Sequence, residues 1–175
     1  MIRVRYTGAM REIILIAHDI RSTHNVGSLL RTAECLGVRH VYLTGYTPYP
    51  GTLGDTRLPH IAQKLSHQIH KTALGAEEFV AWSHAEQVEP VIGELQQQGY
   101  SVIALEQTPK SQDISSWIPP DKIAILLGRE VEGIDAALVA RCGEAIVIPQ
   151  FGEKESLNVV QAAAIALYHC QFYRG

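Results

Sequence analysis

The sequence predicts an α/β protein in which a mostly parallel sheet carries helices on both faces. Strand-like and helix-like segments alternate along almost the whole chain, as they do in parallel sheets with crossover helices. Several strand-like segments are continuous apolar runs, for example residues 13–17 and 123–127, which is typical of strands covered on both sides. The length of 175 residues suits one compact core, so residues 1–175 are expected to form a single domain with a short N-terminal extension at 1–11.

The first βα unit is predicted from its apolar positions and its end signals. Residues 12–17 form an isoleucine-rich run and are the predicted first strand. The apolar residues that follow share one helical face; they are Val26, Leu29, Leu30, Ala33 and Leu36. We expect Asn25 to cap the N-terminus of this helix and Gly37 to lie just beyond its C-terminus.

The remaining elements continue the alternation. A second strand is predicted at 38–43, and a loop rich in glycine, proline and tyrosine follows at 45–56; loops of this length are often functional. The later elements, in chain order, are a helix at 59–71, a strand at 79–82, a helix at 85–98, strands at 100–105 and 123–127, a short helix at 135–141, a strand at 145–148 and a final helix at 156–173.

The final helix has almost no polar face. A helix that is apolar all round is buried, and in a small domain a second copy of the chain could cover one side of it. The sequence therefore predicts a homodimer that packs through its C-terminal helix.

Composition and charge exclude several classes of protein. A net charge of −3 and a pI near 6.2 rule out a uniformly basic surface, although a local basic face stays open. No apolar run is long enough to span a membrane, and the N-terminus does not have the pattern of a signal peptide. Cys35, Cys142 and Cys170 are widely spaced, which favours buried thiols in a reducing compartment, so we expect a cytoplasmic protein.

Common catalytic motifs are missing from the sequence. His60, His67 and His70 lie close together, but no acidic residue completes a metal-ligand set at a familiar spacing, so no metal site is expected. The chain also lacks the GxSxG, GxxxxGK[ST] and GxGxxG motifs, so hydrolase, NTPase and dinucleotide-dependent oxidoreductase activities have no motif to support them.

Three short blocks combine small and polar residues at the ends of predicted strands, where ligands bind in open α/β sheets. The blocks are Asn25-Val26-Gly27 with Arg31, Leu127-Gly128-Arg129-Glu130 with Gly133, and Ile148-Pro149 with Ser156-Leu157-Asn158. Taken singly, each has an ordinary alternative. Asn25 and Ser156 could cap helices, Arg31 could be a solvated side chain, and the segment 128–133 could be a plain turn.

Together the blocks resemble those of the SPOUT class of RNA methyltransferases, and specifically its SpoU (TrmH-type) 2′-O-ribose group. The pattern NxGxxxR begins at Asn25, GxExxG begins at Gly128, and IP…SLN begins at Ile148, all in the order of the family. Residues 70–77 are also similar to a family element. The resemblance extends from about the first strand to the last helix, and Gln150 departs from it where methionine is common.

This resemblance implies an α/β-knot fold, with a C-terminal trefoil knot at about 123–175 that holds S-adenosylmethionine, and a dimer with its active site at the interface. Knots are rare, and nothing in the spacing of the residues predicts one. The implied cofactor-binding residues are Leu105, Gly128, Gly133, Ile148, Pro149, Ser156 and Leu157.

The implied activity is methyl transfer to a ribose 2′-hydroxyl of tRNA or rRNA. The compact architecture of the chain leads us to prefer tRNA over rRNA as the substrate. The implied catalytic residues are Arg31, Asn25, Glu130, Ser156 and Asn158. A guanidinium is a poor base, so we assign Arg31 to gripping a phosphate and stabilising the developing alkoxide, and Glu130 to orienting its neighbours.

Candidate RNA contacts complete the predicted site. They are Arg31, Arg129, Tyr46 and Arg57. Two alternatives remain: an RNA-binding protein of the same fold without catalysis, and a doubly wound enzyme that binds a small nucleotide, which the missing GxGxxG disfavours.

Overall fold

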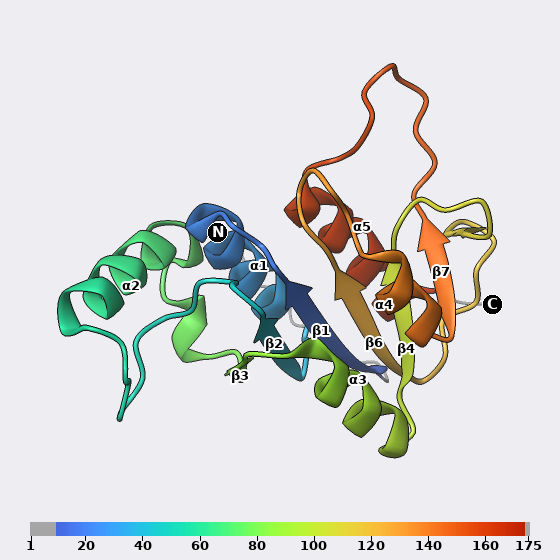
Figure 1. Ribbon diagram of the computed structural model, residues 1–175. Helices are drawn as coiled ribbons and strands as arrows, with labels where there is room; N and C mark the ends of the chain where they lie inside the picture. Colours follow the sequence, from blue (N-terminus) through green and yellow to red (C-terminus); the bar gives the residue numbers. More distant parts are fainter. Residues whose placement is uncertain (1–9, 174–175) are drawn as a thin grey trace.

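A seven-stranded parallel sheet forms the centre of the protein (Figure 1). The computed structural model describes residues 10–173, so most of the predicted N-terminal extension lies outside the described residues. The strand order is β3-β2-β1-β6-β4-β7-β5, and every pair of neighbouring strands is parallel. The strands are β1 (Glu12–His18), β2 (His40–Thr44), β3 (Trp82–Ala85), β4 (Ser101–Leu105), β5 (Gln112–Asp113), β6 (Lys122–Leu127) and β7 (Glu144–Val147).

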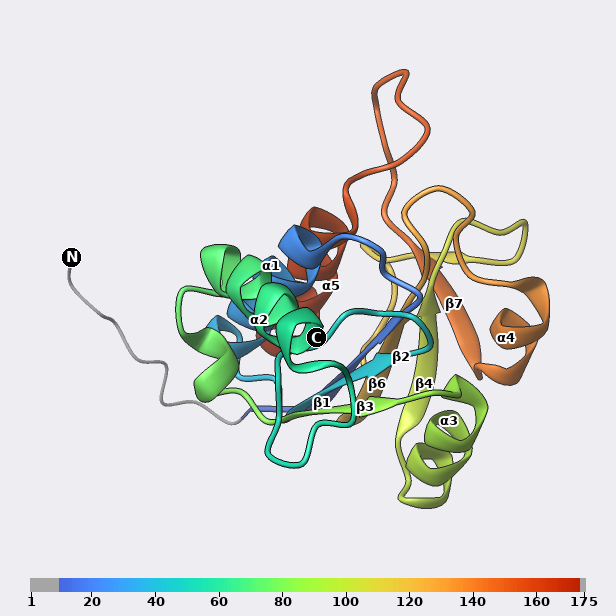
Figure 2. The same ribbon diagram turned by 60° about the vertical axis from the view of Figure 1, so that its left-hand side comes forward.

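Helices cover both faces of this sheet, as Figure 2 shows. One face carries α1 (Thr23–Cys35), α2 (Pro59–Ala73) and α5 (Val159–Phe172), and the other carries α3 (Val88–Gln97) and α4 (Ala136–Arg141). The central strands β1 and β6 alternate their apolar side chains between the two layers, so that Leu15 belongs to the first core and Ile16 to the second. The predicted α/β class, with a parallel sheet and helices on both faces, is confirmed.

The end of the first helix agrees with its prediction, but the start does not. Ser22 is the N-cap, and its Oγ accepts a hydrogen bond from the backbone N–H of Asn25 at 3.2 Å. Asn25 therefore lies in the first turn, where its side chain is free to make other contacts. Gly37 follows the helix with a φ of 69°, as expected for a residue just beyond the C-terminus.

Other predicted boundaries were wrong by a few residues, and one strand was missed. The strand predicted at 79–82 begins at Trp82, because a 3₁₀ turn, η1 (Ala76–Glu78), occupies the preceding residues. The last helix begins at Val159, since Asn158 and not Ser156 caps it by accepting from the N–H of Val160 at 2.9 Å. The two-residue strand β5 has no periodic signal in the sequence and is defined only by its pairing with β7.

Helix α5 is not buried on every side within one chain. Ala163, Ala166 and Leu167 are fully buried, whereas Ile165 is 42% exposed and Tyr168 is 59% exposed. The predicted complete burial is therefore not reached in a single protomer, and the predicted dimer stays a prediction.

Three further sequence predictions can be compared with the described residues. Cys142 and Cys170 are buried, but Cys35 is exposed, so the prediction of three buried thiols was wrong for Cys35 because it lies on the outer side of α1. None of the helices in the described part of the chain is long and apolar enough to cross a membrane. Within residues 10–173 no group of three or more histidine, cysteine, aspartate or glutamate side chains is arranged to hold a metal ion.

Candidate functional site

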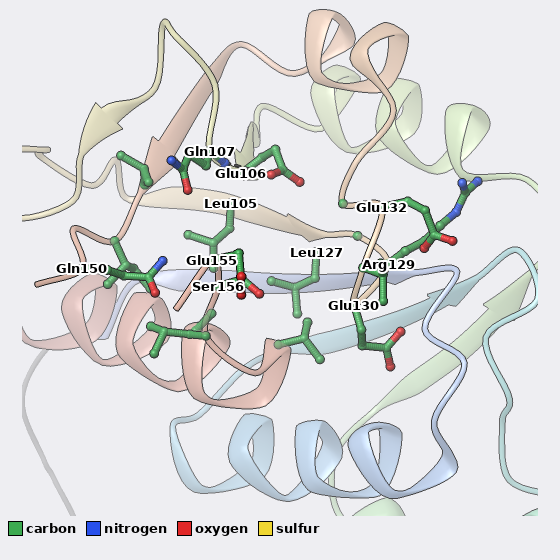
Figure 3. A pocket seen from close by; sticks show the side chains of 18 of the residues that line it. Leu105, Glu106, Gln107, Leu127, Arg129, Glu130, Glu132, Gln150, Glu155 and Ser156 are labelled. Atoms are coloured by element: carbon green, nitrogen blue, oxygen red, sulfur yellow. Dashed lines mark hydrogen bonds between the residues drawn. The ribbon is translucent and has the colours of Figure 1, made fainter. Parts of the chain in front are cut away.

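A cavity of about 430 Å³ lies at the carboxyl ends of β4, β6 and β7, beside the start of α5 (Figure 3). Ligands bind at this edge in open α/β sheets. The lining residues come from the segments 105–107, 127–133 and 146–150 and from the chain around the start of α5, namely Glu155, Ser156, Leu157, Val159 and Ala162. All of the predicted cofactor residues except Pro149 line this cavity. Pro149 is exposed, although its neighbours Ile148 and Gln150 both contribute to the lining.

The segment 128–133 folds into a closed loop at the end of β6. The backbone groups of Arg129 and Gly133 exchange hydrogen bonds of 3.2 Å in both directions, and Gly133 has a φ of 71°. A Cβ atom on Gly128 would lie 2.5 Å from Cγ1 of Ile134 and 2.7 Å from the carbonyl oxygen of Gly133. Gly128 is therefore required by the close approach of the Gly133 backbone, and Gly133 by its positive φ and by the nearby carboxylate of Glu106.

The three sequence blocks meet at Asn25. Its Nδ2 donates to Oε1 of Glu130 at 2.9 Å, and its Oδ1 accepts from Nδ2 of Asn158 at 3.4 Å. Oε2 of Glu130 also accepts from the backbone N–H of Arg21 at 3.4 Å. Glu130 is directed from its loop toward helix α1 in Figure 3. Residues that are more than a hundred positions apart in the sequence thus form one polar cluster beside the cavity.

Glu130 is held as a carboxylate. Its partial burial raises its pKa, but the hydrogen bonds from the Asn25 side chain and from nearby backbone N–H groups outweigh this effect, so the pKa is lowered overall. A carboxyl group with a lowered pKa is a weaker base. This is consistent with the orienting role expected for Glu130.

Acidic residues dominate the charged part of the cavity lining. Glu106, Glu132 and Glu155 join Glu130, and among residues 10–173 Arg129 is the one basic residue that lines the cavity. Glu106 was not among the predicted site residues; its Oε2 accepts a hydrogen bond from the N–H of Ile134 at 2.7 Å. Its only signal was its place directly after the strand that ends in Leu105. Such a lining is suited to a ligand that carries positive charge.

Arg31 lies away from this cavity. It is exposed on α1, six residues after Asn25, which corresponds to about 9 Å along the helix axis and a different side of the helix. It lines a second cavity of about 840 Å³, together with Gly37, Leu74 and Gln171 among others. Among the residues that the structure describes, its side chain has no hydrogen-bond or ion-pair partner.

The predicted RNA contacts differ in how free their side chains are. Tyr46 is 50% exposed. Arg129 forms an ion pair with Asp19, with 3.1 Å between Nη2 and Oδ2. Arg57 is largely enclosed by its own loop, because it pairs with Asp55, donates to the carbonyl of Tyr49 and lies 3.6 Å from the centre of the Tyr49 ring. In this structure Arg57 organises the 45–58 loop.

Gly27 of the first block has a packing role. A Cβ atom at this position would lie 2.2 Å from the carbonyl oxygen of Ile69 and 2.2 Å from Oγ1 of Thr72. Oγ1 of Thr72 also donates to the carbonyl of His24 at 2.9 Å. The missing side chain lets α1 cross closely over α2, which positions the helix that carries both Asn25 and Arg31.

Comparison with known proteins gives a consistent family match. Residues 12–168 match the model of the SpoU rRNA Methylase family. The chain is 25% identical over 157 residues to a tRNA (guanosine(18)-2′-O)-methyltransferase of Borreliella burgdorferi, a match that covers 89% of this chain and 64% of that protein. It is 31% identical over 164 residues to the 23S rRNA (guanosine-2′-O-)-methyltransferase RlmB of Coxiella burnetii, covering 93% of this chain and 59% of that protein. The chain thus spans less than two thirds of the length of these relatives.

Solved structures share the fold. A crystal structure of an AdoMet-bound rRNA methyltransferase from Sinorhizobium meliloti is similar with a TM-score of 0.75 and 23% identity, over 95% of this chain and 60% of that chain. The SpoU methyltransferase AviRb from Streptomyces viridochromogenes, in complex with AdoMet, is similar with a TM-score of 0.76 and 17% identity, over 94% of this chain and 58% of that chain.

Proposed function

The chain belongs to the SpoU rRNA Methylase family, and from this premise we propose that it transfers a methyl group from S-adenosylmethionine to a ribose 2′-hydroxyl of RNA. Family membership confirms the resemblance found in the three sequence blocks. The observation that carries the proposed activity is the cluster in which Asn25 contacts both Glu130 and Asn158, at the border of a cavity lined by the residues predicted to bind the cofactor.

The cavity fits S-adenosylmethionine in size and in chemistry. Its volume of about 430 Å³ lies in the range of small-molecule sites, and its apolar lining includes Leu105, Leu127 and Ile148. The surrounding carboxylates suit the cationic groups of this cofactor, which would supply an activated methyl group there. Gly128 and Gly133 both belong to the lining, and the close contacts around them leave no room for a side chain at either position.

In this proposal the polar cluster orients the acceptor ribose. Asn25 is fixed by Glu130 and Asn158, so its position is set before RNA binds, and positioning of this kind lowers the barrier of a reaction between two bound groups. Ser156 lies on the cavity lining with an exposed side chain, and we assign it to the contact with the cofactor or the ribose.

We further propose that a homodimer, packed through α5, completes the site. The exposed side chains Ile165 and Tyr168 lie on α5, and Arg31 lies too far along α1 to face the cluster of its own protomer. A partner subunit could bring its Arg31 to the cavity, where the guanidinium would grip a phosphate and stabilise the developing alkoxide. Sedimentation of the chain should give two protomers at micromolar concentration, and Ile165→Glu should give one; a wild-type monomer contradicts the proposed dimer.

The family resemblance also leads us to propose the trefoil knot at about 123–175. Two observations support the knot. Strand β6 lies between β1 and β4 although it follows both in the sequence. The loop after β7 projects from the rest of the protein before the chain returns to α5 (Figure 1). Stretching the unfolded chain by its ends tests this. A tightened knot leaves the chain shorter than about 3.6 Å per residue, and a full contour length contradicts it.

The activity is tested by incubating the purified chain with isotope-labelled S-adenosylmethionine and total RNA, followed by digestion to nucleosides. We expect the label in 2′-O-methyl nucleosides. We also expect calorimetry to detect binding of S-adenosylmethionine to the chain and no binding of NAD. RNA binding without any transfer would support the alternative of a catalytically inactive RNA-binding protein.

Separating the RNA before digestion identifies the substrate. The relatives are named as acting on tRNA in one case and on 23S rRNA in the other. We propose tRNA, and label found only in rRNA would contradict this choice. The proposal places the reaction in the cytoplasm, and a fluorescent fusion found outside the cytoplasm would contradict it.

A further inference from the structure

Asp19, directly after β1, is a buried carboxylate in an uncommon backbone conformation. It is 6% exposed and has a φ of 56°, a left-handed conformation that aspartate and asparagine tolerate better than most residues. Its Oδ1 accepts from the N–H of Tyr46 at 3.1 Å. Its Oδ2 accepts from Nε and Nη2 of Arg129, at 3.3 and 3.1 Å, and lies 3.4 Å from Nε2 of His18.

This arrangement fixes one edge of the Arg129 guanidinium and leaves the other edge available. Nη1 of Arg129 has no partner among the described residues, and the side chain is 38% exposed. The hydrogen bond to Asp19 raises the pKa of Arg129, so its charge is secure. An arginine held in this way is preorganised, because little side-chain freedom remains to be lost when it binds a ligand.

Arg129 belongs to a small basic rim, which we define as Arg21, Tyr46 and Arg129. Cζ of Arg21 lies 5.7 Å from the centre of the Tyr46 ring, and the backbone of Tyr46 is held by the same Asp19 that holds Arg129. Arg21 also pairs with Glu132 at 3.4 Å, but both of these side chains are well exposed, so the pair is weak.

Arg129 belongs to the lining of the cofactor cavity, but its guanidinium is not directed into the middle of it. In Figure 3 this guanidinium points away from Leu105 and Ser156. The charged side chains around the cavity itself are otherwise carboxylates, which repel a polyanion. A guanidinium on the outer side of this loop is therefore placed to meet the RNA and not the cofactor, and guanidinium groups bind phosphate through two hydrogen bonds.

We propose that Asp19 is a positioning residue that holds the Arg129 guanidinium, within the basic rim, as a contact for an RNA phosphate close to the target ribose. Arg129 directly precedes Glu130, so the phosphate contact and the polar cluster at Asn25 are carried by adjacent residues of one closed loop. The inference rests on the proposed function, since it names a phosphate contact for the RNA of that reaction.

Three substitutions separate the effect of the positive charge at position 129 from the effect of how that side chain is held. Asp19→Asn keeps an acceptor for the N–H of Tyr46 and suits the left-handed backbone, but it removes the charge that holds Arg129. Arg129→Gln removes the guanidinium that is proposed to contact the RNA phosphate. Arg129→Lys keeps the positive charge but loses the two-pronged contact with Asp19.

The measurements are the affinity for a fluorescently labelled tRNA transcript, its dependence on salt, the affinity for S-adenosylmethionine, and kcat and KM for transfer. We expect all three variants to weaken RNA binding and to raise the RNA KM by about five- to tenfold, and Arg129→Gln to lower the salt slope by about one. The values of kcat and of cofactor affinity should stay within about twofold of those of the wild type. The reason is that Arg129 contacts the phosphate equally in the ground state and in the transition state.

The double variant Asp19→Asn/Arg129→Gln provides the decisive comparison. If Asp19 acts through Arg129, the double variant is no worse than Arg129→Gln alone, because interacting residues are not additive. Additive losses, or an Arg129→Lys variant that binds RNA as well as the wild type, would overturn the inference. So would a loss of cofactor affinity in Asp19→Asn with an unchanged RNA KM, since that result indicates a structural role only.

Glu12→Gln is the matched control. Glu12 lies at the opposite end of β1 and forms an exposed ion pair with Arg39 at 2.7 Å, so its substitution should leave RNA binding unchanged. If the wild type transfers no methyl group, the proposed function fails, but the tRNA affinities of the variants still decide whether Asp19 positions Arg129 for RNA.

Discussion

Two cavities of this protein, the one at the carboxyl ends of the strands and the one beside Arg31, differ in what one protomer supplies to them. The cavity at the ends of β4, β6 and β7 is bordered by a connected cluster, in which Asn25 contacts Glu130 and Asn158. The cavity at the C-terminal part of α1 contains Arg31, whose side chain has no hydrogen-bond or ion-pair partner among residues 10–173. One cavity is preorganised within the chain. The other presents a charged group that the described residues of one protomer leave without such a contact, and we propose that a second molecule meets it.

The largest effect on methyl transfer is expected when the guanidinium of Arg31 is removed. Arg31→Ala should lower methyl transfer by about 1,000-fold, because groups that act mainly in the transition state have effects of this order, while cofactor affinity should stay within about threefold. Transfer assays and calorimetry check this. Lys64→Ala, an exposed change on α2, is the control, and undiminished transfer by Arg31→Ala would remove this residue from the mechanism.

Mixed dimers test whether the two cavities serve each other across an interface. A dimer of one Arg31→Ala protomer and one Glu130→Ala protomer has one intact composite site only if Arg31 acts on the partner's cavity. We then expect about half of the wild-type transfer, which is more than either variant gives alone. Co-expression with two affinity tags provides the mixed dimer. A mixed dimer that is no more active than the mean of its two parents would place Arg31 and the cluster in the same subunit.

The preorganised cavity should be sensitive to a single methyl group. Gly128→Ala places Cβ 2.5 Å from the Ile134 side chain, so the 128–133 loop must move. We expect cofactor affinity to fall by about 30-fold, which corresponds to about 2 kcal/mol of overpacking. Gly152→Ala is the matched control because its Cβ would meet nothing within 4 Å. Equal affinities of the two variants in calorimetry would contradict this account of the loop.

The smallest effect concerns the protonation of the cluster. The pKa of Glu130 is lowered, so Glu130 is ionised at neutral pH, and its link to Asn25 is lost only when the pH falls below the ordinary range of about 4.3. Glu130→Gln should therefore lower transfer by about tenfold without changing the shape of the rate profile between pH 6 and pH 8. If the transfer rate of the wild type falls at low pH and the substitution abolishes this fall, Glu130 acts as a base and the orienting role is wrong.

Much of this architecture could be predicted from the sequence because its signals are local. The apolar run in 13–17 predicts a strand covered on both sides, and the small residues of 128–133 predict a turn at the end of a strand. Of the cofactor-binding residues that the resemblance implies, all but Pro149 lie on the cavity, and their binding of the cofactor stays a prediction. The β5 strand has only two residues, and it exists through pairing and not through any pattern of its own.

Contacts between distant side chains were beyond the reach of the sequence. Asp19 and Arg129 are 110 positions apart, and nothing local distinguishes this arginine from a solvated one. Glu106 was not predicted, because a single glutamate that follows a strand belongs to no recognisable motif. The separation of Arg31 from Asn25 follows from helical spacing once the helix is predicted, but that spacing does not say which groups the Arg31 side chain will meet.

The crossing of α1 and α2 at Gly27 limits how this protein can be engineered. Replacement of a helical glycine by alanine is a common way to raise thermal stability, because it reduces the freedom of the unfolded chain. At position 27 the added methyl group would meet the carbonyl of Ile69 at 2.2 Å, so the helix itself would have to shift. Such a shift would displace Asn25 and Arg31 together. A stabilisation programme should therefore leave this glycine unchanged and look instead to Gly93, where a methyl group has open space.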